Sequence, residues 1–313
     1  MIREQSGESS NSLTHANVLF HLFRTAVAPF LPDEPPGRAR PPVVIGGHGG
    51  SGTRVLPPAL RLAGYWMGYW VNRKTEDALA TRFFLQRNFE RAIGDRFGQQ
   101  PGLERAFRCS IRCHRLRMPD RGGPWGWKNP RCMWVIPFLA SLYPEMKFVH
   151  LVRDGRDVAL SANLNLLRKH GTMLLGDDHP EQDRVRSQLR LWALGNLTAA
   201  RDGERLLGAN YLRLSYEALC SEPRESLGRI YDHLEQPVTP SILDQAQRLI
   251  IPSTSIGGWR QSEHRILHEP DAETAEALRR FGYLADAQTE TGSSGESDAA
   301  ASVTVRALVR PAA

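Results

Sequence analysis

Short apolar runs alternate along this chain with longer stretches that have the spacing or turn signals of helices. Residues 43–45, 147–152 and 210–214 are apolar runs of strand length, and the first of them leads into glycines. Helices are predicted over about 52–62, 76–93, 132–142 and 184–202, and one more follows the second run and continues through residue 167. Strands that alternate with helices form parallel sheets covered on both faces. We therefore predict an α/β fold of three layers around a central parallel sheet.

Proline and small polar residues mark the limits of the expected core. The stretch PDEPPGRARPP at 32–42 is a proline-rich joint, and DAQTETGSSGESDAAAS from residue 286 has the composition of a flexible tail. We expect an N-terminal extension over 1–40 that is partly helical or mobile, one domain over 41–285, and a flexible tail over 286–313. Histidine, asparagine and arginine interrupt the apolar stretch 13–31, which predicts an amphipathic helix rather than a transmembrane segment.

The composition is that of a soluble globular protein with a basic surplus. Of the 313 residues, 41% are hydrophobic and 24% are charged, which excludes a disordered chain, a collagen-like repeat and a disulfide-rich miniprotein. The net charge of +6 favours an anionic ligand, although we expect no nucleic-acid partner. Four cysteines are too few for a disulfide framework, and the first residues are polar rather than a signal peptide, so we expect a cytoplasmic location. Cys109, Cys113 and His114 lack a second ligand pair, and we expect no metal site.

A glycine-rich segment follows the first predicted strand and leads into a helix. It reads GGHGGSGTR over residues 46–54. Glycines let the backbone approach a phosphate closely, and the free N–H groups of a helix start bind anions. The spacing Gly47-x4-Gly52 fits a P-loop, but Thr53 and Arg54 occupy the places of its Lys and Ser/Thr, which argues against an ATP or GTP hydrolase. A P-loop-like anion site is therefore predicted, and the alternative is a glycine-rich turn without a ligand.

A second polar segment follows the strand at 147–152. Arg153 stands at its carboxyl end, where open α/β sheets bind ligands. Ser161 comes eight residues later, which places it about two turns into the next predicted helix. A guanidinium and a hydroxyl can hold a phosphate monoester from two sides. The alternative interpretation is a surface Arg–Asp pair beside a helix serine.

Together these two segments resemble the sulfotransferase family that depends on 3′-phosphoadenosine 5′-phosphosulfate (PAPS). The family's phosphosulfate loop commonly reads Arg-Ser-Gly-Thr-Thr, and here residues 50–54 read Gly-Ser-Gly-Thr-Arg; the family's 3′-phosphate motif, Arg-Asp-x-Arg-Asp-x-x-x-Ser, is matched by Arg153 through Ser161. Four further segments are similar to family motifs: WKNP at 127–130, LSYEAL at 214–219 with EP at 222–223, IGGWR at 256–260 (the late loop) and FGY at 281–283. The likeness spans about residues 43–284.

The resemblance implies transfer of a sulfonate from PAPS to a hydroxyl or amine of a carbohydrate, lipid or small metabolite, without a required metal. It assigns the 5′-phosphosulfate to Gly49, Gly50, Ser51, Gly52, Thr53 and Arg54. It assigns the 3′-phosphate to Arg153 and Ser161. Tyr216 is expected on the adenine side, and Gly257 and Arg260 of the late loop are expected to close over the 3′-phosphate.

The catalytic residues follow from the same resemblance. Lys128 is the candidate cation for the charge that develops in the transition state, because a fixed cation in a dry site accelerates such reactions by ~10²–10³. The family usually has Lys or Arg where Gly50 stands, so His48 or Arg54 would have to substitute. The candidate base is a carboxylate, Asp77 ahead of Glu76, and the alternative for this pair is an acidic first helix turn with a cap.

Several other residues have open interpretations. His114 and His150 are alternative bases, although His150 lies within a strand. Arg105, Arg108, Arg112 and Arg115 would share one face of a helix, either solvated or available to an anionic acceptor. Trp66, Tyr69 and Trp70 could line an acceptor pocket or belong to the core. The competing functions are a P-loop kinase-like phosphotransferase and a degenerate nucleotide-binding protein without catalysis.

Overall fold

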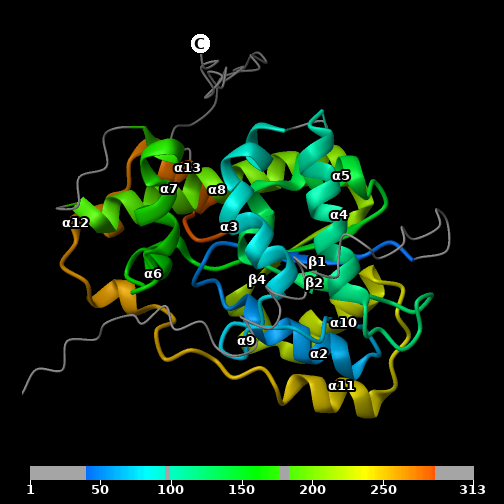
Figure 1. Ribbon diagram of the computed structural model, residues 1–313. Coiled ribbons are helices and arrows are strands. Elements are labelled where there is room, and N and C mark those ends of the chain that lie inside the picture. Colours follow the sequence, from blue (N-terminus) through cyan, green and yellow to red (C-terminus); the bar gives the residue numbers. More distant parts are fainter. Residues whose placement is uncertain (1–39, 96–98, 177–182, 286–313) are drawn as a thin grey trace, which may run out of the picture.

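The computed structural model describes residues 40–95, 99–176 and 183–285 and forms an α/β fold (Figure 1). Four strands make one sheet: β1 (Val43–Gly46), β2 (Gly126–Lys128), β3 (Lys147–Val152) and β4 (Tyr211–Ser215). The strand order is β2-β1-β3-β4, and every neighbouring pair is parallel. The three predicted strands and the parallel sheet are confirmed, and β2 is a strand that the sequence pattern did not predict.

The register brings the chemistry-bearing segments to one edge of the sheet. Ile45 of β1 pairs with Lys128 of β2, and Gly46 pairs with His150 of β3. Val152, the last residue of β3, pairs with Ser215, the last residue of β4. Because all strands run in one direction, the segments that follow them leave from the same edge.

Helices cover both faces of the sheet and give the three predicted layers (Figure 1). One apolar cluster contains Val44, Trp127 and Phe148 and continues into five α-helices. These helices are α3 (Leu79–Gly94), α4 (Pro101–Arg115), α5 (Ile136–Leu142), α7 (Asn165–Leu175) and α8 (Arg184–Leu207). The opposite cluster contains strand residues such as Ile45 and Val149. It packs on α2 (Leu56–Leu62), α9 (Tyr216–Ser221), α10 (Pro223–His233) and α11 (Pro240–Gln247).

A third cluster lies beside the carboxyl end of β3. It joins α6 (Gly155–Ala159) to α8 and to α13 (Ala272–Arg280), with Trp192 at its centre. A Cβ atom at Gly155 would lie 2.4 Å from the Trp192 ring, so the start of α6 can approach α8 only as glycine. The Trp192 indole also donates a hydrogen bond to the carbonyl of Arg153 (2.9 Å). The backbone at the end of β3 is therefore fixed by the core.

Several predicted helices differ from the observed ones at their ends. The helix predicted over 52–62 starts as a 3-10 turn, Thr53–Val55, and continues as α2, while α3 begins at Leu79 rather than 76. The segment 132–142 divides into a 3-10 helix, Pro130–Trp134, and α5. The helix after β3 is interrupted, because α6 ends at Ala159 and α7 (Asn165–Leu175) starts later. The prediction that Ser161 lies inside a helix is therefore wrong, and Ser161 belongs to the connection between α6 and α7.

The expected N-terminal extension, apart from residue 40, and the expected tail over 286–313 lie outside the described residues. Within the residues that are described, no helix combines the length and the apolar character needed to cross a bilayer.

Candidate functional site

The glycine-rich loop leaves β1 at the carboxyl edge of the sheet and turns sharply. The amide of Ser51 donates to the carbonyl of His48 (3.0 Å), and Gly50 and Gly52 have φ values of 103° and 79°. These angles lie in the region that glycine enters without strain. Gly50 therefore has a conformational reason to be glycine, since Lys or Arg at this position would be strained in the same loop.

Tyr216, at the start of α9, packs against this loop. A Cβ atom at Gly52 would lie 2.2 Å from a carbon of the Tyr216 ring, so the loop rests on the aromatic side chain. Gly47 is held on the other side, because its amide donates to the carbonyl of Pro130 (3.3 Å). The loop is thus fixed between β2 and β4 and presents a preformed turn.

Buried polar atoms of the loop have no hydrogen-bond partner among the described residues. Ser51 Oγ and His48 Nε2 are two of them, and Arg153 Nε is a third nearby. Buried polar groups without partners are costly, and a bound polar ligand is one way to satisfy them. The Ser51 hydroxyl and the Arg153 N–H can donate to an anionic ligand with several oxygen atoms, whereas His48 Nε2 can only accept, because Nδ1 carries the hydrogen donated to the Gly49 carbonyl.

His48 does not supply the positive charge that Gly50 lacks. Its burial lowers its pKa to about 4, and the hydrogen bond to the carbonyl of Gly49 opposes this shift only in part. The imidazole is therefore neutral at pH 7, and the prediction that His48 substitutes for a cation is not supported. Arg54, the other predicted substitute, has an exposed side chain at the 3-10 turn after the loop.

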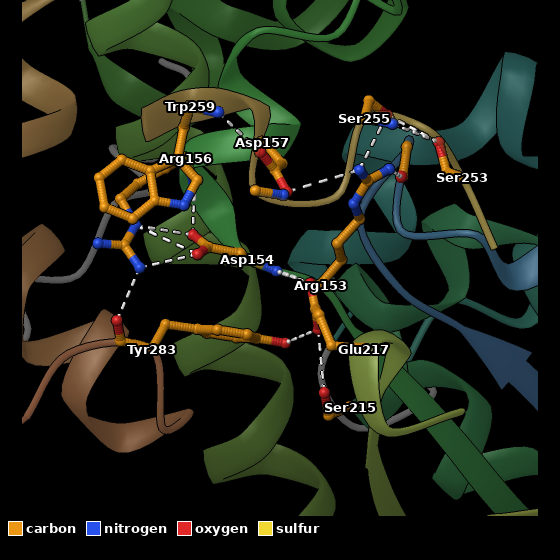
Figure 2. Close-up of polar contacts among 12 residues, drawn as sticks. Arg153, Asp154, Arg156, Asp157, Ser215, Glu217, Ser253, Ser255, Trp259 and Tyr283 are labelled. Carbon is orange, nitrogen blue, oxygen red and sulfur yellow. Dashed lines mark hydrogen bonds and ion pairs between the residues drawn. The ribbon is translucent and has the colours of Figure 1, made fainter. Parts of the chain in front are cut away.

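Arg153 reaches from the end of β3 to the loop (Figure 2). One terminal nitrogen donates to the carbonyl of Gly50 (3.3 Å), and the other donates to Ser255 Oγ (3.0 Å). The guanidinium also lies 5.2 Å from the centre of the Tyr216 ring. A cationic group carried by β3 is therefore fixed against the loop at the position where the loop itself has none.

Ser161 approaches the same place from the α6–α7 connection. A Cβ atom at Gly50 would lie 3.5 Å from Ser161 Oγ, which is ordinary van der Waals distance. Arg153, Ser161 and the loop thus meet around Gly50, as expected from the order of the two sequence segments. These groups do not lie on opposite faces of the sheet, which would have contradicted a shared site.

The late loop is fastened beside Arg153 by Asp157 (Figure 2). The two carboxylate oxygens of Asp157 accept hydrogen bonds from the amides of Gly257 (2.7 Å) and Trp259 (3.1 Å). One of these oxygens also lies 3.6 Å from an Arg153 nitrogen. Gly257 and Arg153 therefore share the Asp157 carboxylate, and the predicted role of Gly257 over the 3′-phosphate stays a prediction. Arg260 has an exposed side chain and lies 5.1 Å from the centre of the Trp259 ring.

Arg156 and Asp154 connect the same region to the end of the domain (Figure 2). The guanidinium of Arg156 donates to both Asp154 oxygens, donates to the carbonyl of Tyr283 (2.7 Å) and stacks 3.6 Å from the centre of the Trp259 ring. The Tyr283 hydroxyl in turn donates to Glu217 (2.7 Å). Sequence reasoning assigned no role to these residues, although the repeated Arg-Asp pairs after a strand were the available signal.

Lys128 and Asp77 form a partly buried ion pair at the end of β2. Lys128 Nζ donates to Asp77 Oδ1 (2.7 Å) and to the carbonyl of Thr75 (2.8 Å), and the two side chains are 3% and 15% exposed. Burial lowers the pKa of Lys128, and the negative charge of Asp77 opposes that shift. The cation and the carboxylate that the sequence analysis singled out are thus in direct contact.

Glu76 and Asp77 do not cap α3, because Ala78 is the N-cap residue and the first turn of α3 holds no acidic side chain. They belong to a turn in which Glu76 has a φ of 59°. The Glu76 carboxylate points to a different cation, Arg61 of α2, at 2.7 Å. The helix-cap alternative is therefore wrong, and Asp77 rather than Glu76 faces Lys128.

Both histidines that were alternative bases have structural roles. Burial lowers the pKa of each to about 4. His114 Nε2 is 2.8 Å from the carbonyl of Gly126, and His150 lies between the Tyr211 hydroxyl (2.6 Å) and Asn196 (3.0 Å). Neither ring lies at the glycine-rich loop in these contacts, so we place both in the core.

The arginine face of α4 is only partly solvated. Arg105 and Arg108 are exposed, whereas Arg115 is buried, with its guanidinium 4.4 Å from the centre of the Trp125 ring. The interpretation that all four guanidiniums lie on one solvated face is therefore wrong. Of the three aromatic candidates, Trp66 packs against the core, while Tyr69 is 53% exposed and pairs edge-on with Trp70.

Comparison with known proteins identifies one family. A family model described as a sulfotransferase family matches residues 41–240. The solved sulfotransferase STF9 of Mycobacterium avium is 14% identical with a TM-score of 0.51, and the match covers 85% of this chain and 81% of that one. The sulfotransferase STF1 of Mycobacterium tuberculosis is 14% identical with a TM-score of 0.47, with coverage of 83% and 82%. No curated protein matches.

Proposed function

The chain belongs to the sulfotransferase family, and on that premise we propose that it transfers a sulfonate group from PAPS to a hydroxyl or amine of an acceptor by in-line displacement. When bound, PAPS supplies an electrophilic sulfur and a phosphate leaving group. The acceptor would be a carbohydrate, a lipid or a small metabolite. The M. avium structure supports the fold alone, so the roles below are argued from the residues of this chain.

The observation that carries the proposal is the meeting of the glycine-rich loop, Arg153 and Ser161 around Gly50. A nucleotide with phosphate groups at both its 3′ and 5′ positions needs two anion sites within one nucleoside length. We assign the first to the backbone amides of the loop together with Ser51, Thr53 and Arg54. We assign the second to Arg153 and Ser161, because a guanidinium and a hydroxyl bind a phosphate from two sides.

The remaining donor contacts follow from the neighbours of this pair. Tyr216 lies beneath both Gly52 and Arg153, where an adenosine would extend from the loop. The late loop lies beside Arg153 through Asp157, which supports a role for Gly257 in covering the 3′-phosphate. Arg260, whose side chain turns toward Trp259, would have to rotate to take part.

Lys128 and Asp77 divide the catalytic work in this proposal. Lys128 places a desolvated cation at the edge where β1 and β2 end, and such a cation stabilises negative charge that develops in a transition state. Asp77 gives one oxygen to Lys128 and keeps Oδ2 for the proton of the acceptor hydroxyl or amine. His48 is neutral and donates its Nδ1–H to the Gly49 carbonyl, so its free Nε2 is an acceptor and gives the anionic groups of the donor neither a charge nor a hydrogen bond.

The proposal is tested by nucleotide binding in calorimetric titrations. We expect Arg153→Ala to weaken binding of 3′,5′-ADP by about 10–100-fold, since charge-assisted hydrogen bonds contribute ~1.5–3 kcal/mol each, and to weaken AMP binding far less. Arg87→Ala, an exposed arginine of α3, is the matched control and leaves both affinities unchanged. An equal loss for 3′,5′-ADP and AMP would contradict the assignment of Arg153.

The competing functions give different results in the same experiment. A P-loop kinase would bind ATP with magnesium in these titrations and would not bind 3′,5′-ADP alone. A degenerate binding protein, which the glycine at position 50 favours, would bind PAPS tightly and release no sulfonate to any acceptor. Transfer of labelled sulfonate from PAPS excludes both.

A further inference from the structure

Two arginines add positive charge near the ion pair of Asp77 and Lys128. Arg82 belongs to the first turn of α3, and one of its terminal nitrogens is 3.9 Å from Asp77 Oδ2. Arg131 follows Lys128 by three positions, in the 3-10 helix that leaves β2. Both side chains are partly buried. Arg82 therefore stands beside the carboxylate that we propose as the base, and the charge of Arg131 interacts with both of these residues.

The guanidinium of Arg131 is held by packing rather than by an acidic partner. It lies 5.5 Å from the centre of the ring of Phe89, which belongs to α3. Across the described parts of the chain, it makes no hydrogen bond or ion pair through its side chain. An arginine offers five N–H donors, so this fork has unused hydrogen-bonding capacity in a partly desolvated place.

The two arginines also repel each other. Burial lowers the pKa of Arg131 first, the positive charge of Arg82 lowers it further, and only Asp77 acts in the opposite direction. Arg131 in turn contributes to the lowered pKa of His170, whose main cause is burial. A single carboxylate, already bound to Lys128, thus faces two further cations. Uncompensated like charges of this kind cost stability and attract anions.

We infer that the acceptor carries an anionic group, a carboxylate or a phosphate, and that Arg82 and Arg131 bind it while its hydroxyl or amine lies at Asp77. This inference rests on the proposed function, because it extends the site of Asp77 and Lys128 outward. Planar guanidinium forks match carboxylate and phosphate oxygens in geometry. Phe89 keeps the Arg131 fork in place, and Asp77 repels an anion from the position of the reacting group. The pair therefore orients the acceptor as well as binding it.

The first experiment measures anion binding without catalysis. The full chain, saturated with 3′,5′-ADP so that the donor site is filled, is titrated with inorganic phosphate and separately with acetate. At least one of the two anions should bind to the wild type, and we expect the R82Q/R131Q protein to bind that anion at least tenfold more weakly. The Arg87→Gln control should bind it as tightly as the wild type does. The two arms separate phosphate from carboxylate recognition. Equal binding by the wild type and R82Q/R131Q in both arms overturns the inference.

The second experiment reads the charge of the product. A metabolite extract is incubated with the protein and sulfur-labelled PAPS, and the labelled product is separated by anion exchange. We expect the labelled product to elute as a compound with more negative charge than one sulfate group carries. We also expect the KM for the acceptor to rise in R82Q and in R131Q but not in R87Q. A labelled product that carries the sulfate charge alone overturns it, although sulfonate transfer itself would then stand. Failure of 3′,5′-ADP to bind would instead contradict the proposed function.

Discussion

Replacement of Lys128 by methionine tests the catalytic part of the site most directly. Methionine keeps the apolar stem and removes the ammonium, so Asp77 Oδ1 and the Thr75 carbonyl lose the donor that contacts them at 2.7 and 2.8 Å. We expect turnover to fall by ~10²–10³ at saturating donor. The affinity for 3′,5′-ADP should change little, because the donor phosphates are assigned to other residues.

The same variant has a cost in stability that follows from the geometry. Removal of one partner of a buried ion pair costs about 3–5 kcal/mol. Asp77 is 15% exposed and Arg82 stands 3.9 Å from its second oxygen, so the carboxylate keeps partial solvation and a neighbouring cation. We therefore expect the lower end of that range, about 3 kcal/mol. Combining Lys128→Met with Asp77→Leu removes both charges and should recover part of the loss.

The assays are sulfonate transfer from labelled PAPS and urea unfolding followed by tryptophan fluorescence. Lys169→Met, at an exposed position of α7, is the matched control and should change the free energy of unfolding by less than about 0.5 kcal/mol. Lys128→Arg keeps a charge and separates the loss of catalysis from the loss of folding. A folded Lys128→Met protein that turns over within threefold of the wild type would refute the role of Lys128. Strictly additive stability losses for positions 77 and 128 would refute the ion pair.

Two further predictions concern the loop contacts and the buried imidazoles. Asp157→Ala should speed hydrogen exchange at the amides of Gly257 and Trp259, which lose their acceptor oxygens; unchanged exchange would show that other contacts hold the late loop. Burial lowers the pKa of His48 and of His150 to about 4 in the folded chain, against an ordinary value of 6.5 when unfolded. The unfolded chain therefore binds more protons between those values, so this part of the stability is complete above pH ~6.5. It should be lost as the pH falls toward 4, by about 1.4 kcal/mol per pH unit for each histidine. Urea unfolding at several pH values measures this slope, which His150→Phe should reduce, and a stability independent of pH would contradict it.

The parts of the fold that the sequence predicted are those with strong local patterns. The apolar runs at 43–45 and 147–152 are buried strands, and the glycine-rich loop and Arg153 follow them directly. Local chemistry and motif order were sufficient for these features. Lys128 and Asp77 were both named as catalytic candidates, Lys128 within WKNP and Asp77 after the glycine-rich loop, but their contact across 51 positions was not predicted.

The features that escaped prediction depend on tertiary contacts. Strand β2 has only three residues, Gly126–Lys128, and it exists because it pairs with β1. The break after Ala159 lets Ser161 reach Gly50, and no proline or glycine in the sequence marks it. Arg115 stands in a helical row with three other arginines, but its position against Trp125 draws it into the core. Spacing alone cannot separate such a residue from its solvated neighbours.

The carboxylate of Asp157 touches the guanidinium of Arg153 and two amides of the late loop at once. An incoming anion at Arg153 would compete with that carboxylate, while withdrawal of the late loop would leave the same carboxylate to pair with Arg153 alone. The side chain of Asp157 therefore links anion binding at Arg153 to the position of the late loop, which lies about one hundred residues further along the chain. Binding of an anion at Arg153 and the position of this segment should accordingly shift each other's equilibrium.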